Sequence, residues 1–291
     1  MRGRQHQTQQ ANVRALILPL ALGLTLGACR MLDASAPISF EPIVYTSPGD
    51  VEVPVSTQRS SGSMSVMLIG DSLSVGPFGD RMLAYFRQKL DPSQYVIYAS
   101  CGSSPESWLK DSPDFITPCG FRMVTARESW KTDYHDGKKP RPVRTPKLAS
   151  IISKSRPPQL VIVQMGTNWM DEFVGSSDLS GDLKKIIIRK FITEIRAKTT
   201  PYVQIVWVLP PDSSKYSSRL KDAVDRWIND CARELKFKTI NTRGFTDRYV
   251  KGKSGADGVH LNAAAGHEWA NGVIKRLPKI TSTVVSQTSA L

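Results

Sequence analysis

The sequence has few cysteines and few histidines, and it has no apolar stretch long enough to span a membrane as a helix. Only 4 Cys occur in 291 residues, which excludes a small scaffold built from disulfides. The longest apolar run, residues 15–26, is shorter than the roughly 20 residues that a membrane-spanning helix needs. No Cys-x-x-Cys or His-x-x-x-His spacing is present, so we expect no structural zinc, no other metal and no cofactor.

Acidic residues are scarce relative to basic ones. The chain has 39 Lys and Arg against 26 Asp and Glu, which gives a formal net charge of +13. This excess favours polyanionic partners, namely nucleic acid, anionic lipid or acidic glycan. The hydrophobic content, in contrast, is an ordinary 40%, which excludes a largely disordered chain.

The N-terminus has the pattern of an export signal. Three Arg occur within residues 1–14, and the apolar run 15–26 follows them. The next segment, Leu26-Gly27-Ala28-Cys29, resembles the bacterial lipobox, in which the cysteine is acylated and becomes the mature N-terminus. The alternative is an ordinary signal peptide followed by a chance cysteine. We therefore predict a lipoprotein signal peptide over 1–28 and lipidation at Cys29.

This signal also narrows the partners. An exported basic protein rarely meets nucleic acid, so we expect no nucleic-acid partner and a membrane association through the lipid on Cys29. Arg30, rather than Asp, follows that cysteine, and this favours the outer membrane by the usual enterobacterial sorting pattern. The expected location is therefore the bacterial cell envelope, as a periplasmic lipoprotein.

From residue 64 onwards, short apolar runs alternate with helical patterns. The predicted strands are 65–69, 95–99, 160–164, 203–209 and 237–240, and the predicted helices are 78–90, 179–198, 217–235 and 263–277. Such alternation is typical of a parallel sheet covered on both faces. We therefore expect one three-layer α/β/α domain over 64–280. A flexible tether rich in Ser, Pro and Thr precedes it over 29–63, and a C-terminal tail follows over 281–291.

Two segments carry more specific expectations. In the helix over 179–198, Leu183, Ile187, Phe191 and Ile195 form the expected buried stripe. The interval 103–147 fits neither the helical nor the strand period and is rich in Lys and Arg. A loop of this length is either functional or a solvated insertion without a role.

Polar residues follow the predicted strands at the sheet edge where ligands bind in parallel α/β folds. Ser72 stands directly after the first strand, at a strand-to-helix turn that suits a nucleophile. His260, just before the last helix, is the histidine expected at the same edge and would be its base. Asp257 lies three residues earlier and would hold the imidazole, which completes a Ser-His-Asp arrangement. The backbone N–H groups of Ser72 and Gly102 and the side-chain amide of Asn168 could form an oxyanion hole.

These segments resemble the four blocks of the SGNH hydrolases, also called the GDSL family. Gly70-Asp71-Ser72-Leu73 matches the nucleophile block, Gly102 the second, Gly166-Thr167-Asn168 the third and Asp257-Gly258-Val259-His260 the last. The resemblance implies a flavodoxin-like sheet and a metal-free ester hydrolase or acyltransferase. One residue departs from the pattern, because Trp169 follows Asn168 where the family usually has Asp. No Gly-x-Ser-x-Gly elbow occurs, which argues against an ordinary α/β-hydrolase.

The other cysteines divide into a pair and a single residue. Cys101 and Cys119 lie in Gly-, Ser- and Pro-rich sequence and are the expected disulfide in an oxidising compartment. Cys231 lies on the apolar face of a helical pattern and is expected to be a buried thiol.

The substrate is less closely defined. Envelope members of the family often act on O-acetyl groups of peptidoglycan or exopolysaccharide, so the resemblance favours a carbohydrate O-acetylesterase with an acylated carbohydrate as its partner. Trp108, Trp130 and Trp169 fall in predicted loops, where they could stack on sugars or anchor the loops in the core. The alternatives are a lipase-like or thioesterase-like hydrolase of longer acyl chains, a glycan O-acetyltransferase, and a non-catalytic glycan-binding lipoprotein.

Overall fold

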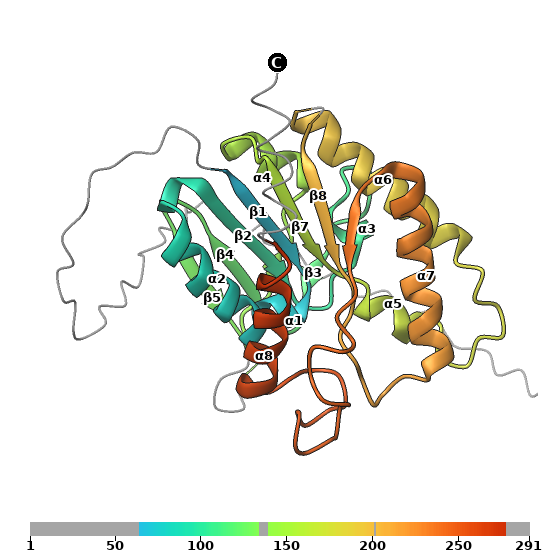
Figure 1. The fold of residues 1–291 in the computed structure, drawn as a ribbon. Helices are drawn as coiled ribbons and strands as arrows, with labels where there is room; N and C mark the ends of the chain where they lie inside the picture. Colours follow the sequence, from blue (N-terminus) through green and yellow to red (C-terminus); the bar gives the residue numbers. More distant parts are fainter. Residues whose placement is uncertain (1–63, 134–138, 201, 278–291) are drawn as a thin grey trace, which may run out of the picture. The chain divides into compact units, whose positions relative to one another are not determined.

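A seven-stranded, mostly parallel sheet forms the centre of the computed structural model, which describes residues 64–133, 139–200 and 202–277 (Figure 1). The strands are β1 (Val66–Gly70), β2 (Tyr95–Ser100), β4 (Phe121–Val124), β5 (Ser129–Thr132), β7 (Leu160–Gln164), β8 (Gln204–Val208) and β9 (Lys238–Ile240). Their order across the sheet is β5-β4-β2-β1-β7-β8-β9. The predicted signal peptide, tether and tail (1–28, 29–63 and 281–291) lie outside the described residues.

The five strands expected from the sequence are all present, and they pair in parallel. The central strand β1 has β2 on one side and β7 on the other, with Gly70 opposite Ala99 and Gln164. The carboxyl ends of these three strands therefore lie at the same edge of the sheet. This register places the segments that follow β1, β2 and β7 next to one another.

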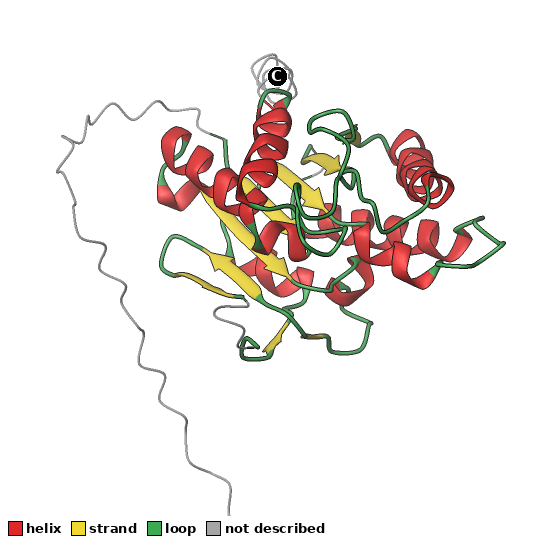
Figure 2. Ribbon diagram, turned by 90° about the horizontal axis from the view of Figure 1, so that it is seen from below, coloured by secondary structure: helices red, strands yellow, loops and turns green. Residues whose placement is uncertain are grey.

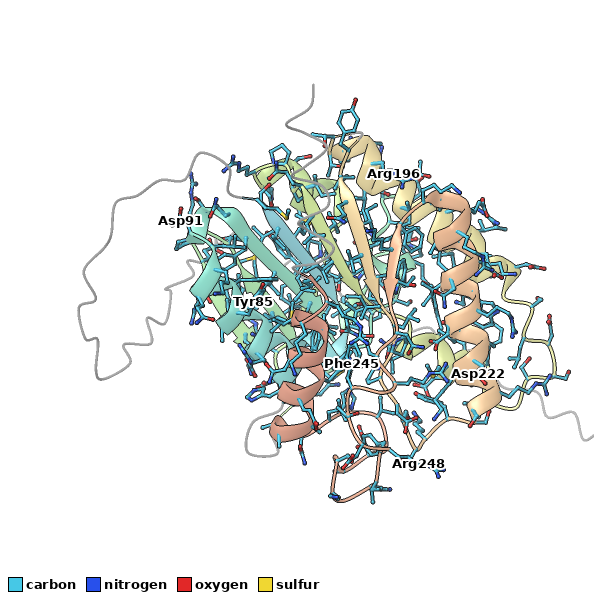
Figure 3. All side chains as sticks on the ribbon, in the orientation of Figure 1. Tyr85, Asp91, Arg196, Asp222, Phe245 and Arg248 are labelled. Atoms are coloured by element: carbon cyan, nitrogen blue, oxygen red, sulfur yellow. A yellow bond between two sulfur atoms is a disulfide. The ribbon has the colours of Figure 1, made fainter. Side chains whose placement is uncertain are left out.

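Helices cover both faces of the sheet (Figure 2). On one face lie α2 (Pro77–Lys89) and α8 (Ala263–Ile274), and on the other α4 (Leu148–Lys154), α6 (Asp182–Lys198) and α7 (Ser218–Leu235). Alternate β1 residues pack into the two layers, Leu68 toward α2 and α8 and Ile69 toward α6 and α7. Side chains fill both layers (Figure 3). The predicted three-layer α/β/α class is confirmed.

Shorter elements connect these layers. They are α1 (Ser72–Val75), η1 (Pro92–Gln94), α3 (Pro105–Trp108), β3 (Ile116–Thr117), β6 (Val143–Arg144) and α5 (Thr167–Glu172). Strands β3 and β6 pair with each other in a small antiparallel sheet. No helix in the described part of the chain is both long and apolar enough to cross a membrane.

The interval 103–147 contains four strands that the sequence did not predict, β3 to β6, and two of them join the central sheet. Strand β4 pairs antiparallel with β2, and β5 pairs antiparallel with β4, so the sheet is not purely parallel. The sequence of β4 does not look like a buried strand because it contains a charged residue, Arg122, which is nevertheless only 2% exposed. The Arg122 guanidinium donates to the carbonyl of Val75 (2.7 Å) and pairs with Asp80, which satisfies its charge inside the protein.

The predicted buried stripe of α6 was partly wrong. Phe191 and Ile195 are buried, but Leu183 is 66% exposed and Ile187 is only half-buried. Lys184 and Ile188 take the inward positions instead. The helix is rotated by about one residue relative to the apolar pattern, and the inward-facing Lys184 forms ion pairs with two glutamates, which are described below.

Candidate active site

The turn after β1 places Ser72 at the start of α1, at the carboxyl edge of the sheet. Asp71 precedes it as the N-cap residue, and its Oδ1 accepts a hydrogen bond from the backbone N–H of Leu73 (3.0 Å). This bond fixes the first turn of α1. Ser72 itself is 8% exposed, so its hydroxyl lies at the surface of the fold without being freely solvated.

The three residues predicted as a triad lie in hydrogen-bond contact. His260 Nε2 is 2.8 Å from Ser72 Oγ, and His260 Nδ1 is 2.5 Å from Asp257 Oδ2. The other carboxylate oxygen of Asp257 accepts from the backbone N–H groups of Val259 (2.9 Å) and His260 (2.8 Å). Burial raises the pKa of Asp257, but the hydrogen bonds from His260 and the backbone outweigh it and lower this pKa to about 2. Asp257 is therefore ionised when it holds the imidazole.

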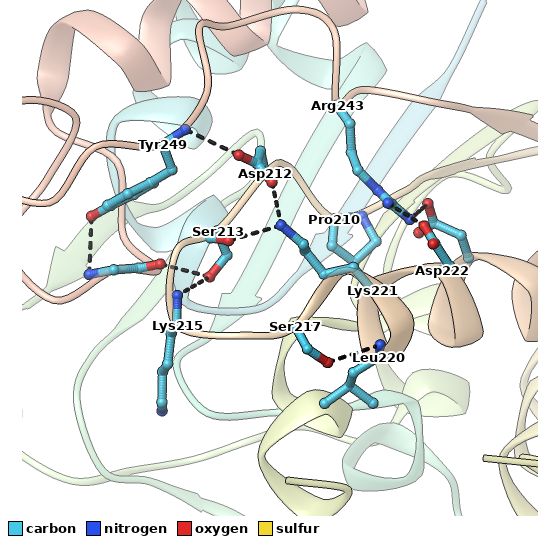
Figure 4. Close-up of polar contacts among 12 residues, drawn as sticks. Pro210, Asp212, Ser213, Lys215, Ser217, Leu220, Lys221, Asp222, Arg243 and Tyr249 are labelled. Carbon is cyan, nitrogen blue, oxygen red and sulfur yellow. Dashed lines mark hydrogen bonds and ion pairs between the residues drawn. The ribbon is translucent and has the colours of Figure 1, made fainter.

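A polar network holds the loop that carries Asp257 and His260 (Figure 4). The Tyr249 hydroxyl donates to the carbonyl of His260 (2.9 Å) and accepts from the N–H of Gly258 (3.2 Å). The Ser213 hydroxyl donates to the Gly258 carbonyl (2.6 Å), and the buried Lys221 ammonium binds the Ser213 carbonyl (2.9 Å). Gly258 has φ +88°, a conformation that other residues rarely adopt. These contacts fix the backbone between Asp257 and His260.

The expected oxyanion donors also lie at this edge. The N–H groups of Ser72 and Gly102 have no acceptor within the ranges that the structure describes. Gly102 has φ +82°, and a Cβ there would lie 3.2 Å from the Pro118 ring, so the position requires glycine. The Asn168 amide donates one hydrogen to the carbonyl of Ser103 (2.7 Å), which leaves its second hydrogen for a ligand.

The sequence model of the family described as GDSL-like Lipase/Acylhydrolase matches residues 66–273, which is most of the chain and includes every group described above. The chain belongs to this family. The resemblance predicted from the four motifs is therefore confirmed, and with it the enzyme class of an SGNH esterase. No curated protein matches the chain in sequence.

Solved structures of similar fold include several esterases. One is an acetyl esterase solved with an acetate ion (15% identity, TM-score 0.47, covering 76% of this chain and 100% of that chain). Another is the psychrotrophic esterase EstA from Pseudoalteromonas sp. (10% identity, TM-score 0.48, covering 76% and 100%). A third is a member of the lipolytic G-D-S-L family from Veillonella parvula (13% identity, TM-score 0.42, covering 73% and 97%).

The GDSL domain contains a disulfide directly beside Gly102, one of the expected oxyanion donors. Cys101 and Cys119 form the predicted bridge, with their Cα atoms 5.4 Å apart. Cys101 immediately precedes Gly102, and its N–H donates to the carbonyl of Gly120 (2.9 Å). The bridge therefore ties the end of β2 to the segment that leads into β4. Cys231 is a free, buried thiol, also as predicted.

Trp169, the departure from the GDSL pattern, belongs to an ionic cluster around the buried Lys184 that the sequence did not reveal. Its indole Nε1 donates to the Glu106 carboxylate (3.0 Å), and the Lys184 ammonium lies 5.6 Å from its ring centroid. Lys184, 4% exposed, also binds Glu106 (2.9 Å) and Glu172 (2.6 Å). The cluster joins α3, which follows the Gly102 segment, to α5, which carries Asn168. It thus braces the segments that carry Gly102 and Asn168, the two arms of the expected oxyanion hole, against α6.

Of the two alternatives for the loop tryptophans, burial in the core holds for Trp108 and Trp169. Both side chains are fully buried, and their indole N–H groups bond internally, Trp108 to the Ser103 hydroxyl (3.1 Å) and Trp169 to Glu106. Trp130 alone of the three is exposed (38%), and it packs against Phe121 in β4.

Asp71, a buried carboxyl group next to Ser72, has a shifted pKa that the sequence did not predict. Its side chain is fully buried, and burial raises its pKa to about 7 although the Leu73 N–H opposes this. Asp71 Oδ2 and Gln164 Nε2 are both buried without a hydrogen-bond partner in the described residues. Gln164 Oε1 instead accepts from the Ser74 hydroxyl (2.6 Å). Asp71, Ser74 and Gln164 therefore form a buried polar layer at the start of α1, in which the Gln164 side chain also opposes the rise of the Asp71 pKa.

We expect Asp71→Asn to change how stability depends on pH. Between pH 4 and 7 the unfolded chain has lost the Asp71 proton, whereas the folded chain still holds it. Raising the pH through this interval therefore lowers the free energy of unfolding, by up to about 1.4 kcal/mol per pH unit for one such group. The Asn variant lacks this contribution, so its stability should fall less between pH 4 and 7 than that of the wild type.

Urea unfolding at four pH values between 4.5 and 7.5 measures this difference. Asp225, whose pKa burial raises to about 6, titrates in both proteins and cancels in the comparison. Parallel stability curves for the two proteins would show that Asp71 is ionised in the folded state.

A small apolar cavity of about 100 Å³ adjoins Ser72 and His260. Its walls come from α1, α2 and α8, and include Leu73, Phe78, Leu261 and Trp269. No group of three or more His, Cys, Asp or Glu that could hold a metal ion occurs in the described segments. The arrangement as a whole combines a hydrogen-bonded hydroxyl, a base with its carboxylate, unoccupied donors and a short apolar recess.

Proposed function

We propose that this GDSL hydrolase is a serine esterase that removes O-acetyl groups from a carbohydrate of the bacterial cell envelope. The observation that carries the proposal is the site geometry: the apolar cavity beside Ser72 is small, whereas the charged half of the site is open. The His260 and Asp257 side chains are 49% and 52% exposed. An open site of this kind suits an acetyl group carried on a polymer.

The proposed reaction proceeds through an acyl-enzyme. His260 Nε2 accepts the proton of Ser72 Oγ as that oxygen attacks the ester carbonyl, and Asp257 stabilises the imidazolium that forms. The oxyanion accepts hydrogen bonds from the N–H groups of Ser72 and Gly102 and from the Asn168 amide. His260 then gives its proton to the departing sugar oxygen. Water, deprotonated by His260, attacks the acetyl-Ser72 ester; His260 returns the proton to Ser72 Oγ as the acyl bond breaks, and acetate leaves.

The size of the cavity predicts a preference for short acyl chains. A chain that extends into an apolar pocket gains about 0.8 kcal/mol for each methylene that it buries. A cavity of about 100 Å³ offers little room beyond the first carbons. We therefore expect kcat/KM for p-nitrophenyl esters to fall from acetate to butyrate to octanoate. A preference for octanoate over acetate of about tenfold or more would favour the lipase-like alternative instead.

Leu261→Ala tests whether this cavity is the acyl site. The change enlarges the cavity and should raise the butyrate-to-acetate ratio of kcat/KM several-fold. Leu277→Ala is the matched control, because Leu277 is buried in the same apolar layer but does not line the cavity. Equal ratios in the two variants would place the acyl chain elsewhere.

The carbohydrate part of the proposal has its own test. Acetate release from O-acetylated peptidoglycan and from an O-acetylated exopolysaccharide should proceed with a higher kcat/KM than hydrolysis of p-nitrophenyl acetate, because contacts with remote sugars can stabilise the transition state. Hydrolysis of the small ester without release from either polymer would contradict it. Acetyl transfer to an added glycan in place of release would indicate the acyltransferase alternative.

We further propose that the enzyme is a lipoprotein of the outer membrane, held by an acyl anchor on Cys29. The basis is the lipobox-like segment before that cysteine, which lies outside the described residues. Cys29→Ser should move the protein from the membrane fraction to the soluble fraction and remove label incorporated from radioactive palmitate. A variant that still sediments with membranes and still carries label would rule out this anchor.

A further inference from the structure

A second and larger hollow lies away from the triad. Its volume is about 650 Å³, and it is bounded by the open side of β2, β4 and β5 and by α4 with the segment that follows it. We call it the β4–β5 groove. Phe121, which lies opposite Ser100, borders it near the carboxyl edge of the sheet, and Arg156, shortly before β7, borders it at the opposite edge. The groove therefore extends along β2 from the edge that carries the active site.

The floor of the groove is aromatic. Tyr98 and Phe121 are nearly buried beneath it, and Trp130 exposes 38% of its surface. The Trp130 and Phe121 rings pack with their centroids 5.3 Å apart, which holds the indole in place on the sheet. An indole held this way and left partly open offers a flat apolar surface at little entropic cost.

The rim of the groove is strongly basic. Arg127, Arg144, Lys154 and Arg156 line it, and Glu128 is the one acid among its described lining residues. Arg144 pairs with Asp114 (3.0 Å). Arg127, Lys154 and Arg156 are exposed and form no ion pair within the described segments. These three cations line the same groove as the partly exposed Trp130 ring. The positive rim and the aromatic floor together favour an anionic ligand with flat apolar faces.

We infer that the β4–β5 groove is an accessory binding site for an acidic polysaccharide, whose carboxylates pair with Arg127, Lys154 and Arg156 while a sugar ring stacks on Trp130. The choice of a polysaccharide rests on the proposed function, and the groove adds that the polymer is negatively charged. A concave site with an aromatic floor fits an extended chain better than the flat surface of an anionic membrane, which would meet the rim cations but not the floor. The site assigns a role to the part of the interval 103–147 that carries Arg127 and Trp130.

Charge reversal tests the rim. The test uses the full chain with Cys29→Ser, so that no acyl anchor contributes, and polygalacturonate as the probe. Arg127→Glu, Lys154→Glu and Arg156→Glu together should weaken binding at least tenfold, and the wild-type affinity should fall steeply with added salt. The matched control reverses Arg87, Lys89 and Lys198, which are exposed on α2 and α6, do not line the groove and make the same change in net charge. This control should change affinity less than threefold.

The floor has a separate test. Trp130→Ala should weaken binding several-fold at high salt, where the charges are screened, and a melting curve checks that β5 remains folded. Turnover of p-nitrophenyl acetate should be unchanged in every variant, since none of these residues touches the triad. Weaker polymer binding with normal turnover would therefore be an effect on the groove alone. A loss of turnover would show that the variant also disturbs the esterase site of the proposed function.

Three outcomes would overturn the inference. One is equal weakening by the rim and control variants, which would mean that only net charge matters. Another is equal binding of neutral dextran and polygalacturonate. The third is binding to vesicles containing phosphatidylglycerol, with no binding to polygalacturonate, which would make the groove a membrane-facing surface.

Discussion

Replacing Ser72 with Ala should lower kcat for p-nitrophenyl acetate by about 10⁴-fold or more, while the protein keeps its fold. The hydroxyl is the proposed site of acylation, and without it only the binding contribution of the oxyanion donors remains. The Ser72 hydroxyl bonds to His260, which is half exposed, so the loss of one oxygen leaves no buried group unpaired. Steady-state kinetics of the variant measure the loss of kcat, and its circular dichroism spectrum checks that the fold is kept.

Ser74→Ala is the matched control for this experiment. Ser74 lies in the same short helix but is fully buried, and its hydroxyl binds Gln164 rather than His260. We expect this variant to melt at a lower temperature and yet to keep most of its turnover. A Ser72→Ala protein with more than about 1% of the wild-type kcat would exclude Ser72 as the nucleophile.

The second large effect concerns stability. Lys184→Met should lower the free energy of unfolding by about 3 kcal/mol, because it removes a buried cation and leaves the Glu106 carboxylate partly buried without its charge partner. For a domain of this size that loss corresponds to a melting temperature lower by roughly 6–12 °C. Thermal unfolding measures it directly. Lys190→Met, an exposed position on the same helix, should shift the melting temperature by less than about 2 °C.

A further comparison separates positioning from stability. The double variant Lys184→Met with Glu106→Gln should recover part of the stability, since no unpaired charge then remains. We expect Lys184→Met to lower kcat with KM little changed, and the double variant to keep this lower kcat because the brace between α3 and α5 is still missing. Full recovery of kcat in the double variant, or a wild-type melting temperature for Lys184→Met, would show that the cluster does not hold the oxyanion arms.

The sequence predicted those parts of the fold in which each segment carries its own signal. The parallel strands are apolar runs, and the triad residues stand directly after them or directly before a helix, so topology alone brings them together. Strand β4 was missed because its buried Arg122 depends on Asp80, 42 residues away. The orientation of α6 was missed because the buried Lys184 forms ion pairs with glutamates on other helices, Glu106 on α3 and Glu172 on α5. In each case the deciding partner is distant in sequence and invisible to a local pattern.

The site residues that the sequence predicted differ from those it missed in the same way. Ser72, His260 and Asp257 have few alternatives in a chain with four histidines, and the GDSL motifs order them. Glu106 and Gln164 belong to no motif, and their roles arise from contacts across the fold. Trp169 was noted as a departure from the family pattern, but only its bond to Glu106 shows what the replacement does.

The separation of Ser72 and His260 along the chain has a kinetic consequence. The two residues are 188 positions apart, and the bond between them forms only when α8 has docked on α2, where Phe78 and Trp269 pack with ring centroids 4.1 Å apart. Closing so long a loop is a slow, non-local event compared with forming the individual helices. During refolding, esterase activity should therefore return after helix content has recovered. The appearance of turnover would then report the docking of the last helix rather than the collapse of the sheet.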